Sequence, residues 1–389
     1  MTTDTPPPRR KWHLQRWLLL LAAGFLAYSG WTTYAFRAAI KEARALGWAV
    51  EYTDPVEEIR KNWKFAFRKE IWLDGVKGVV IPTGKSFAQH HELFRQLNSK
   101  GLHIYDAAGL RDISGLGGLA RLEWVSLNAC TNLKSLDAIN GLTGLKGVFL
   151  GDCDELENLD GLKNLGALEY LTIDRSRKLT NVKASITLVS LQEARLVGCT
   201  GLLNVDGLEG LKALRKVDLR GCKSLRNVDG LKGLPALKEI KLSDCDGLTS
   251  VAGLKGLPAL LELTISNAWG LTNIDSLNGL ATLKTVGIVD CGGLTNVDAL
   301  KGLTVLESLD LSGCTGLTDI TGLKGLPMLR FVGLSGCERL SNVDALKTLP
   351  GLQEAYLAER QYYHERTGLT KESVEALRTA LPHVIISYP

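Results

Sequence analysis

A leucine recurs every 23 residues through most of this 389-residue chain. It stands at Leu122 and returns without a slip of register as far as Leu352. With this leucine as position 0, apolar residues return at positions 3, 5, 11, 14, 17 and 20, as in LRKVDLRGCKSLRNVDGLKGLPA, residues 214–236. A less regular coil precedes them at 99–121, so eleven 23-residue coils, numbered 1 to 11 here, run from 99 to 351. A fixed period of this length is typical of a solenoid.

The spacing within a coil predicts its local structure. Positions 3 and 5 alternate as the inward side chains of a short strand do. Position 14 is apolar and is followed in most coils by Asp, which is a favoured N-cap, so we expect a short helical turn to begin at this Asp. One coil cannot bury its apolar edge alone, whereas stacked coils share a continuous core. The fold class is therefore predicted to be an α/β solenoid.

The motif L-x-x-L-x-L-x-x-C-x-x-L resembles the leucine-rich-repeat signature, in its variant with Cys where Asn is commoner. The remainder of the coil, NVDGLKGL, is similar to the short-coil bacterial arrays of the internalin type. The resemblance covers about two thirds of the chain. It implies a right-handed horseshoe with a parallel sheet on the concave side. It specifies no ligand, because proteins of this family bind proteins, glycans and lipids alike.

Sequence without the repeat flanks the array on both sides. Residues 37–98 are expected to form a juxtamembrane region and N-terminal cap, because an uncapped array exposes its core. Their high density of aromatic residues also fits a docking surface near a membrane. Residues 352–389 are predicted to form a C-terminal cap. It consists of a last strand, an amphipathic helix with Thr370 as its N-cap, and a closing strand in HVIISYP.

Residues 17–36 form an uncharged, apolar run of twenty residues, about the length that crosses the ~30 Å of a bilayer's hydrocarbon. Trp17, Trp31 and Tyr34 lie near its ends, where amphipathic rings favour the membrane interface. We predict a transmembrane signal-anchor helix. The basic residues before it favour a cytoplasmic tail, 1–16, and repeats on the periplasmic side or at the cell surface. A cleaved signal peptide is the alternative, and it also places the repeats outside the cytoplasm.

Charge argues against nucleic acid as a partner. Residues 99–389 carry 31 Lys and Arg against 33 Asp and Glu, whereas nucleic-acid binding requires a sustained basic face. A row of lysines recurs at position 18, on the outer side of the coils, and is interpreted as a solvated face whose stems cover apolar surface. It comprises Lys163, Lys232, Lys255, Lys301, Lys324 and Lys347.

All eight cysteines fall at position 8, directly after the predicted strand. They are Cys130, Cys153, Cys199, Cys222, Cys245, Cys291, Cys314 and Cys337, while Ala107, Ser176 and Ala268 take this place in the other coils. A small buried side chain fits there, and the three exceptions argue against crosslinks. We predict a structural ladder of reduced thiols. Disulfides between adjacent coils are the alternative, because neighbouring Cα atoms would be close enough. The cysteines lack C-x₂-C spacing and a nearby histidine, so neither a metal nor a cofactor is expected.

The sequence suggests no enzyme. Gly84-Lys85-Ser86 imitates a phosphate-binding loop, but Val79 stands where that loop needs a glycine, and we interpret the likeness as chance. The chain has no G-x-S-x-G, H-E-x-x-H or G-x-G-x-x-G motif. A binding function is therefore favoured.

The concave face is predicted from positions 1, 2, 4, 6 and 7 of each coil, which point out of the sheet. Large aromatic residues gather there in the first coils and charges of both signs in the middle, whereas Thr264 to Ser312 are small or bland. The predicted ligand-binding residues are Tyr105, Trp124, Phe149, Tyr170, Asp174, Arg195, Asp218, Arg220 and Lys241. Such residue types carry most protein-binding hot spots, so we expect a protein or peptide partner. Two alternatives are that the rings pack beneath the N-terminal cap, and that the array is a rigid spacer of the cell envelope.

The predicted anchor can be tested by protease shaving of intact cells after any outer barrier has been permeabilised. We expect the repeats to be cleaved and the tail 1–16 to be protected, because the apolar run of 17–36 holds the chain in the membrane. Repeats that resist external protease until the inner membrane is opened would reverse this topology.

Overall fold

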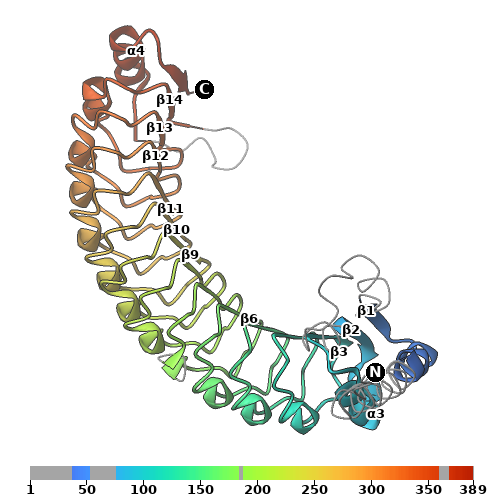
Figure 1. The fold of residues 1–389 in the computed structure, drawn as a ribbon. Coiled ribbons are helices and arrows are strands. Elements are labelled where there is room, and N and C mark those ends of the chain that lie inside the picture. The colour runs from blue at the N-terminus through green and yellow to red at the C-terminus, as the bar shows by residue number, and fades with distance from the viewer. Residues whose placement is uncertain (1–36, 53–75, 184–186, 359–367, 389) are drawn as a thin grey trace, which may run out of the picture.

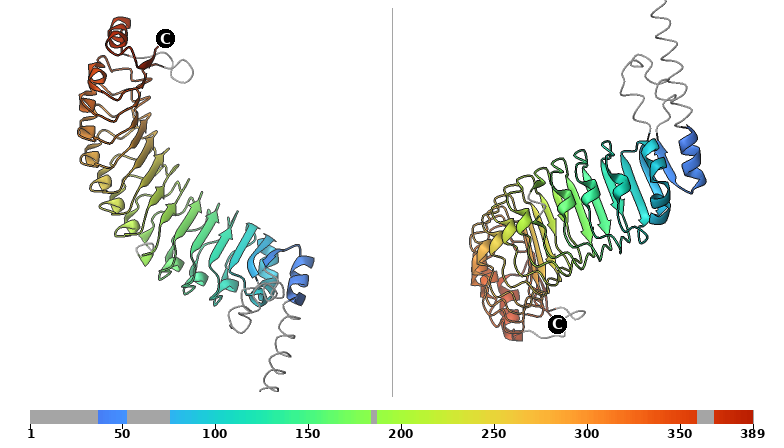
Figure 2. Two further views of the ribbon diagram at one scale, coloured as in Figure 1. Left: turned by 45° about the horizontal axis from the view of Figure 1, so that its top comes forward. Right: turned by 90° about the horizontal axis from the view of Figure 1, so that it is seen from below.

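A computed structural model of the chain describes residues 37–52, 76–183, 187–358 and 368–388. Figure 1 shows an arc with strands along its inner, concave side and short helical turns along its outer, convex side. The turned views of Figure 2 show that this division holds along the arc. Each coil contributes one strand, and ten of the eleven coils show a described 3₁₀ turn, so the predicted leucine-rich-repeat solenoid with a parallel concave sheet is confirmed.

One fifteen-stranded sheet runs through the described part in chain order. The hairpin of β1 and β2 is antiparallel, and each later neighbour is parallel. The strands are β1 (Ala49–Tyr52), β2 (Val76–Thr83), β3 (Gly101–Asp106), β4 (Trp124–Leu127), β5 (Gly147–Gly151), β6 (Tyr170–Asp174), β7 (Glu193–Arg195), β8 (Lys216–Asp218), β9 (Glu239–Ser243), β10 (Glu262–Ser266), β11 (Thr285–Val289), β12 (Ser308–Asp310), β13 (Phe331–Gly333), β14 (Glu354–Tyr356) and β15 (Ile385–Ser387). From β3 to β14, residues 23 apart pair with each other, as Val217 and Ile240 do.

The convex side carries one 3₁₀ turn in almost every coil. The turns are η2 (Ser114–Leu116), η3 (Asp137–Ile139), η4 (Asp160–Leu162), η6 (Asp206–Leu208), η7 (Asp229–Leu231), η8 (Ala252–Leu254), η9 (Asp275–Leu277), η10 (Asp298–Leu300), η11 (Thr321–Leu323) and η12 (Asp344–Thr348). Residues 37–45, α3 (Gly84–Leu97) and α4 (Lys371–Ala380) are helical at the two ends of the array.

The predicted helical turns are present, but the residue that caps them is not the predicted one. The apolar residue at position 14, for example Val228, is in the N-cap position and makes no side-chain capping bond. The Asp that follows is the first helical residue. Its backbone N–H donates to the Oδ1 of the Asn two residues earlier, at 3.2 Å from Asp229 to Asn227. Asn thus fixes the turn by a local side-chain bond, and Asp places a negative charge at the positive end of the turn.

The core consists of the apolar positions read from the repeat. In coil 6, Leu214, Val217, Leu219, Leu225 and Val228 are all buried, with at most 1% of their surface exposed. Equal positions of successive coils lie side by side along the arc, so a single core of leucine, valine and isoleucine runs through the described chain. Each coil therefore buries its apolar edge against its neighbours rather than against itself.

Both caps pack on the terminal coils. At the N-terminal end, Phe87 and Phe94 of α3 meet edge to face with ring centroids 5.8 Å apart, and Trp48 is buried with them. The Arg95 guanidinium donates to the Gly117 carbonyl of coil 1 at 2.8 Å. At the other end, Thr370 caps α4 as predicted, accepting the Ser373 N–H at 3.2 Å. The strand β15 then pairs in parallel with β14.

The predicted membrane segment, residues 17–36, and the tail 1–16 lie outside the described residues. Among the helices that the structure does describe, none is long and apolar enough to cross a membrane.

The cysteines form a buried ladder along the carboxyl ends of the strands. Six of them are free thiols, and five of these donate to the backbone carbonyl of position 5 in the preceding coil. The Cys222 Sγ lies 3.0 Å from the Leu196 oxygen, and the Cys199 Sγ lies 3.2 Å from that of Ile173. Burial raises the pKa of the Cys199, Cys245 and Cys337 thiols to about 12 and that of Cys291 to about 11.

The expectation of reduced thiols is wrong for the first pair, because Cys130 and Cys153 form a disulfide. The parallel register explains how this is possible. It places the two Cα atoms 4.6 Å apart, within the range that a disulfide spans. Five of the six later thiols instead donate to a carbonyl oxygen of the preceding coil. The ladder is thus a crosslink at its N-terminal end followed by hydrogen-bonded thiols.

We expect the six free thiols to resist alkylation at pH 8 until the chain unfolds, and Cys130 and Cys153 to react only after reduction. The raised pKa also sets a pH dependence. Unfolded thiols ionise near pH 9, whereas the folded ones remain protonated, so the free energy of unfolding should fall as pH rises from about 9 towards 12. Denaturant unfolding measured at several pH values tests this.

Cys199→Ala provides the matched control, because Ala107 and Ala268 already occupy this position in other coils. The variant should lose part of the alkaline decline while keeping most of its stability at pH 7. Rapid alkylation of the six thiols in the native protein, or further disulfides in it, would contradict the ladder.

Candidate binding surface on the concave face

The concave face carries the exposed side chains of the parallel sheet. Positions 3 and 5 are buried, so positions 2 and 4 point to the other side. The register stacks equal positions of successive coils, as Gly147 pairs with Tyr170 and Phe149 with Thr172. Neighbouring strands lie about 4.8 Å apart. Positions 2 and 4 therefore form two continuous rows along the arc, and position 6 adds a third.

An aromatic cluster of Trp124, Phe149 and Tyr170 lies at the N-terminal end of these rows. The rings of Trp124 and Phe149 are stacked with centroids 6.1 Å apart, and those of Trp124 and Tyr170 are 5.9 Å apart. Gly147 makes room for them, since a Cβ there would collide with the Trp124 and Phe149 rings. Trp124 remains 37% exposed. The cluster thus presents a preformed apolar platform to the inside of the arc.

The described N-terminal cap has a core of its own. Helix α3 packs against β2, β3 and η2, and buries Phe87 and Phe94. None of the three rings of the aromatic cluster belongs to the continuous core that joins the described cap residues to the coils. Tyr105, the fourth predicted aromatic residue, lies on β3, but its side chain is outside the described set.

Beside the aromatic cluster, four of the predicted charged residues form one network. The Arg195 guanidinium lies 3.1 Å from Asp174 on one side and 3.1 Å from Asp218 on the other. Asp218 also accepts two side-chain bonds from Arg220, at 2.9 and 2.7 Å. Asp218 is the most shielded member, with 15% of its side chain exposed. The sequence predicted these four residues as a set, and the fold brings them together.

Lys241, the remaining predicted residue, belongs to a second network. Glu239 accepts from Lys241 at 2.6 Å and from Lys216 at 3.0 Å. Glu239 and Lys216 were not predicted, although both stand at position 2, which points to the concave side. The pairing register carries the signal that could have found them, because it places Lys216 directly beside Glu239.

The two networks lower the pKa of Asp218 and of Glu239. Burial alone would raise the pKa of Asp218, but the hydrogen bonds and positive charges of Arg220 and Arg195 outweigh it, and the pKa is lowered. The hydrogen bonds from Lys241 and Lys216 lower the pKa of Glu239. The middle of the concave face is therefore a strip of fixed ion pairs, which we call the ionic strip. It consists of Asp174, Arg195, Asp218, Arg220, Lys216, Glu239 and Lys241.

Beyond the ionic strip most side chains in the three rows are small, as Thr264, Ser266 and Gly287 are, but Glu262 and Asp310 are charged. Asp310 stands in the row of position 4, where its carboxylate accepts the Ser312 N–H at 3.0 Å and the Ser312 hydroxyl at 2.6 Å. Farther on, Phe331 and Tyr356 pack with ring centroids 5.4 Å apart. Large aromatic residues thus lie at both ends of the concave face.

The described residues contain no group of three or more His, Cys, Asp or Glu side chains placed to hold a metal ion. The features that the concave face does offer are an apolar platform and fixed charges, which are means of recognition.

Among known proteins, no family model and no curated protein matches the chain. Three solved structures with similar folds are a leucine-rich-repeat protein of Leptospira interrogans, an internalin of Listeria monocytogenes, and an internalin C2 of the same organism. The Leptospira protein has a TM-score of 0.46 at 16% identity, over 83% of this chain and 92% of its own. The two internalins have TM-scores of 0.42 and 0.40 at 16% and 20% identity. The first internalin matches over 86% of this chain and 88% of its own length. Internalin C2 matches over 54% of this chain and 84% of its own length. These likenesses are distant, and the architecture rests on the coils of this chain themselves.

The ionic strip yields a test of its own. Asp218→Asn keeps the size of the side chain but removes the charge shared by two arginines, and we expect a loss of about 1–2 kcal/mol in the free energy of unfolding at pH 7. Because the pKa of Asp218 is lowered in the fold, its contribution is present above pH ~4 and is lost as pH falls further. The variant should therefore differ less from the wild type at pH 3 than at pH 7 in denaturant unfolding.

Asp246→Asn is the matched control, since that carboxylate is half-exposed and lies 3.8 Å from its partner Lys223. Exposed pairs contribute little, and the control should be nearly neutral. Equal losses in both variants would contradict a special role for the network around Asp218.

Proposed function

We propose that this chain is a membrane-anchored, extracytoplasmic leucine-rich-repeat protein that binds a protein or peptide partner on its concave face and catalyses no reaction. The observation that carries the proposal is the uneven decoration of a uniform sheet. Coils 2 to 4 expose three touching aromatic rings, and the ionic strip adjoins them. Coils 8 and 9 carry no aromatic residue in the same rows, which hold Glu262, Thr264, Ser266, Thr285, Gly287 and Val289.

This unevenness supports recognition of a partner over a spacer function. Exposed apolar patches usually mark contact sites, and aromatic and arginine side chains dominate binding energy at protein interfaces. A spacer requires the buried ladder and the coil turns alone. Coils 8 and 9 stack without an aromatic platform like that of Trp124 and without a network like that around Asp218. Coil stacking therefore does not require these two features.

The membrane anchor supports the same proposal from the sequence. Residues 17–36 would tether the array, and residues 37–45, which follow them in the chain, are helical. A tethered arc presents its concave face at a fixed distance from the membrane, which raises the effective concentration of a partner held at the same surface.

Photo-crosslinking in native cells tests the concave face whatever the identity of the partner. A photoreactive phenylalanine analogue at Phe149 should give one discrete adduct in the full-length protein, whereas the same group at Gly287, in the same row of coil 9, should give none. Trp124→Ala in the Phe149-labelled protein should lower the yield about tenfold, because truncation of a central aromatic residue typically removes ~1.4 kcal/mol or more of binding energy.

Thermal unfolding of each variant separates binding from folding. Trp124→Ala should leave the melting temperature within a few degrees of the wild type, since its ring stacks on the sheet surface outside the core. Equal adducts at Phe149 and Gly287 would argue for a spacer with chance contacts. A large fall in melting temperature for Trp124→Ala would instead assign the ring to the folded core.

A further inference from the structure

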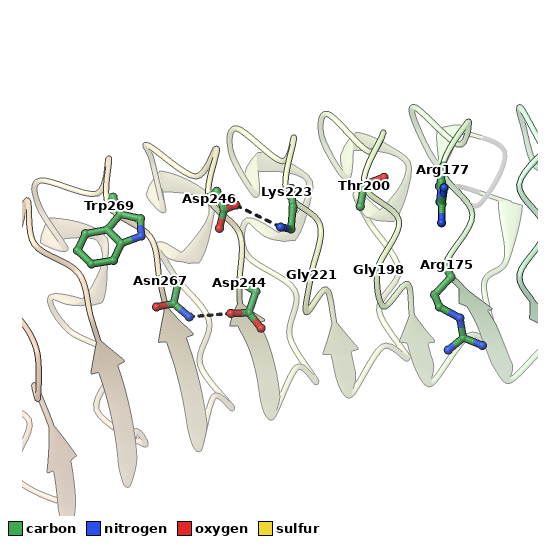
Figure 3. A pocket seen from close by; sticks show the side chains of 10 residues that line it. All are labelled: Arg175, Arg177, Gly198, Thr200, Gly221, Lys223, Asp244, Asp246, Asn267 and Trp269. Atoms are coloured by element: carbon green, nitrogen blue, oxygen red, sulfur yellow. Dashed lines mark hydrogen bonds and ion pairs between the residues drawn. The ribbon is translucent and has the colours of Figure 1, made fainter. Parts of the chain in front are cut away.

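A groove of about 550 Å³ lies at the edge of the sheet where the strands end, apart from the concave rows. Figure 3 shows its two walls, each formed by one residue from each of coils 4 to 8. The lower wall carries position 7, directly after the strands, and includes Arg175, Asp244 and Asn267. The upper wall carries position 9, and includes Thr200 and Trp269. We call it the edge groove.

Two glycines open the lower wall of the edge groove. Gly198 and Gly221 stand at position 7 of coils 5 and 6, with φ of 70° and 74°. This left-handed backbone recurs at position 7 along the array, and it favours Gly, Asn or Asp. Arg175 has φ 54° nevertheless, at a cost of about 1–2 kcal/mol. Strain of this kind gathers at functional sites, so the retention of an arginine side chain here points to a use for it.

The charges along the groove are balanced. Arg175 is held by two hydrogen bonds to Asp152, Arg177 lies 3.5 Å from Asp154, and Lys223 lies 3.8 Å from Asp246. Phosphate and nucleic-acid ligands are bound by cations in excess, which these pairs do not supply. Asp244 accepts from the Asn267 amide at 2.6 Å, which leaves further acceptor positions on the pair. The walls therefore suit a ligand that is polar but uncharged.

Trp269 gives the groove an aromatic platform. Its side chain is 59% exposed. The ring lies beside Gly292 of the next coil, where a Cβ would stand 3.4 Å from its Cε3 atom. A Cβ at Gly292 would only touch the indole, and most of the ring faces solvent. The negative face of an aromatic ring attracts the C–H groups of a sugar ring, and its indole N–H is a further donor.

The spacing of the coils favours a glycan over a peptide as the ligand of the edge groove. Equivalent side chains recur along the groove at steps of about 4.8 Å, the distance between neighbouring strands. An extended peptide advances about 3.3 Å per residue, so its side chains drift out of register with the coils. An extended chain of β-linked pyranose rings advances by about one coil step per sugar. Four steps, from coil 4 to coil 8, span about 20 Å.

We infer that the edge groove binds a neutral oligosaccharide chain, with one sugar stacked on Trp269 and the hydroxyls of its neighbours hydrogen-bonded to the Asn267–Asp244 pair and to Thr200. The groove shares no residue with the aromatic cluster or the ionic strip, so the inference does not depend on the proposed concave interface. Arg175 and Arg177 close the groove at its other end, where their paired guanidinium groups still offer N–H donors.

The test uses the full-length protein in a detergent without a sugar headgroup. The probes are the β-1,4-linked hexamers of glucose and of N-acetylglucosamine, with the curved α-1,4-linked glucose hexamer as a comparison, titrated by calorimetry. We expect saturable binding of at least one β-linked hexamer and at least tenfold weaker binding of the α-linked one. Because the ligand is neutral, its affinity should change less than about twofold between about 50 and 500 mM salt.

Variants locate the binding. Trp269→Ala should weaken binding of the β-linked hexamer about tenfold or more, Trp269→Phe should weaken it less, and Asn267→Ala should weaken it as well. Trp124→Ala on the concave face is the matched control and should leave it unchanged. Trp269 is exposed, so its variants should keep the melting temperature of the wild type.

Lack of saturable binding by both β-linked hexamers overturns the inference. So does equal binding of an alternating Lys-Glu peptide that Trp269→Ala abolishes, since the groove would then hold a peptide. The crosslink at Phe149 should persist in Trp269→Ala, which keeps failure of the edge groove distinct from failure of the concave interface.

Discussion

Stacking of successive coils is the constraint on which the rest of this structure depends. The apolar positions of a coil, such as Leu214 and Leu231, are fully buried because the coils before and after them cover what one coil cannot. The backbone tolerates little change in this spacing. At Gly230 a Cβ would lie inside contact distance of the Val205 carbonyl oxygen of the preceding coil. The repeat of leucines and the glycine at position 16 of six coils therefore serve one requirement, the close approach of parallel coils; Ala or Ser stands at this position in the other five coils.

Stacking also accounts for the cysteine ladder. A thiol at position 8 reaches the carbonyl of position 5 in the preceding coil, as Cys222 reaches Leu196. Ser176 stands at the same position, is fully buried, and its hydroxyl has no hydrogen-bond partner in the described structure. A C–O bond is shorter than a C–S bond, so serine falls short of the acceptor that cysteine reaches. Cysteine thus satisfies a carbonyl at the end of a strand while filling space as a small apolar residue.

The sequence predicted the core and the rows of the concave face because both follow from period alone. A repeat that never slips assigns every apolar position in every coil at once, and the burial of Val217 and Leu219 follows from one template. Features that depend on distances between coils were not predictable in this way. The disulfide of Cys130 and Cys153 requires a specific rotation of two side chains, and the hydrogen bond that Asn227 accepts from Asp229 depends on the geometry of the backbone turn. The edge groove was not predicted for the same reason, since residues at positions 7 and 9 of five coils form it together.

In an array this regular, residues that differ from those at the same position of other coils are informative. Each coil packs against its neighbours in the same way. A residue that differs from its counterparts in other coils and does not contribute to the core therefore requires another explanation. Gly147 departs by removing a side chain, and its absence lets the Trp124 ring lie across the sheet. Gly292 also lies beside a tryptophan, Trp269, two residues past position 7 and on another surface, although a Cβ there would only touch the ring. Each pairs an exposed tryptophan with a glycine one coil later, at 124 and 147 and at 269 and 292, always 23 residues apart. The repeat that holds the core together therefore also positions two separate aromatic platforms, one inside the arc and one along its edge.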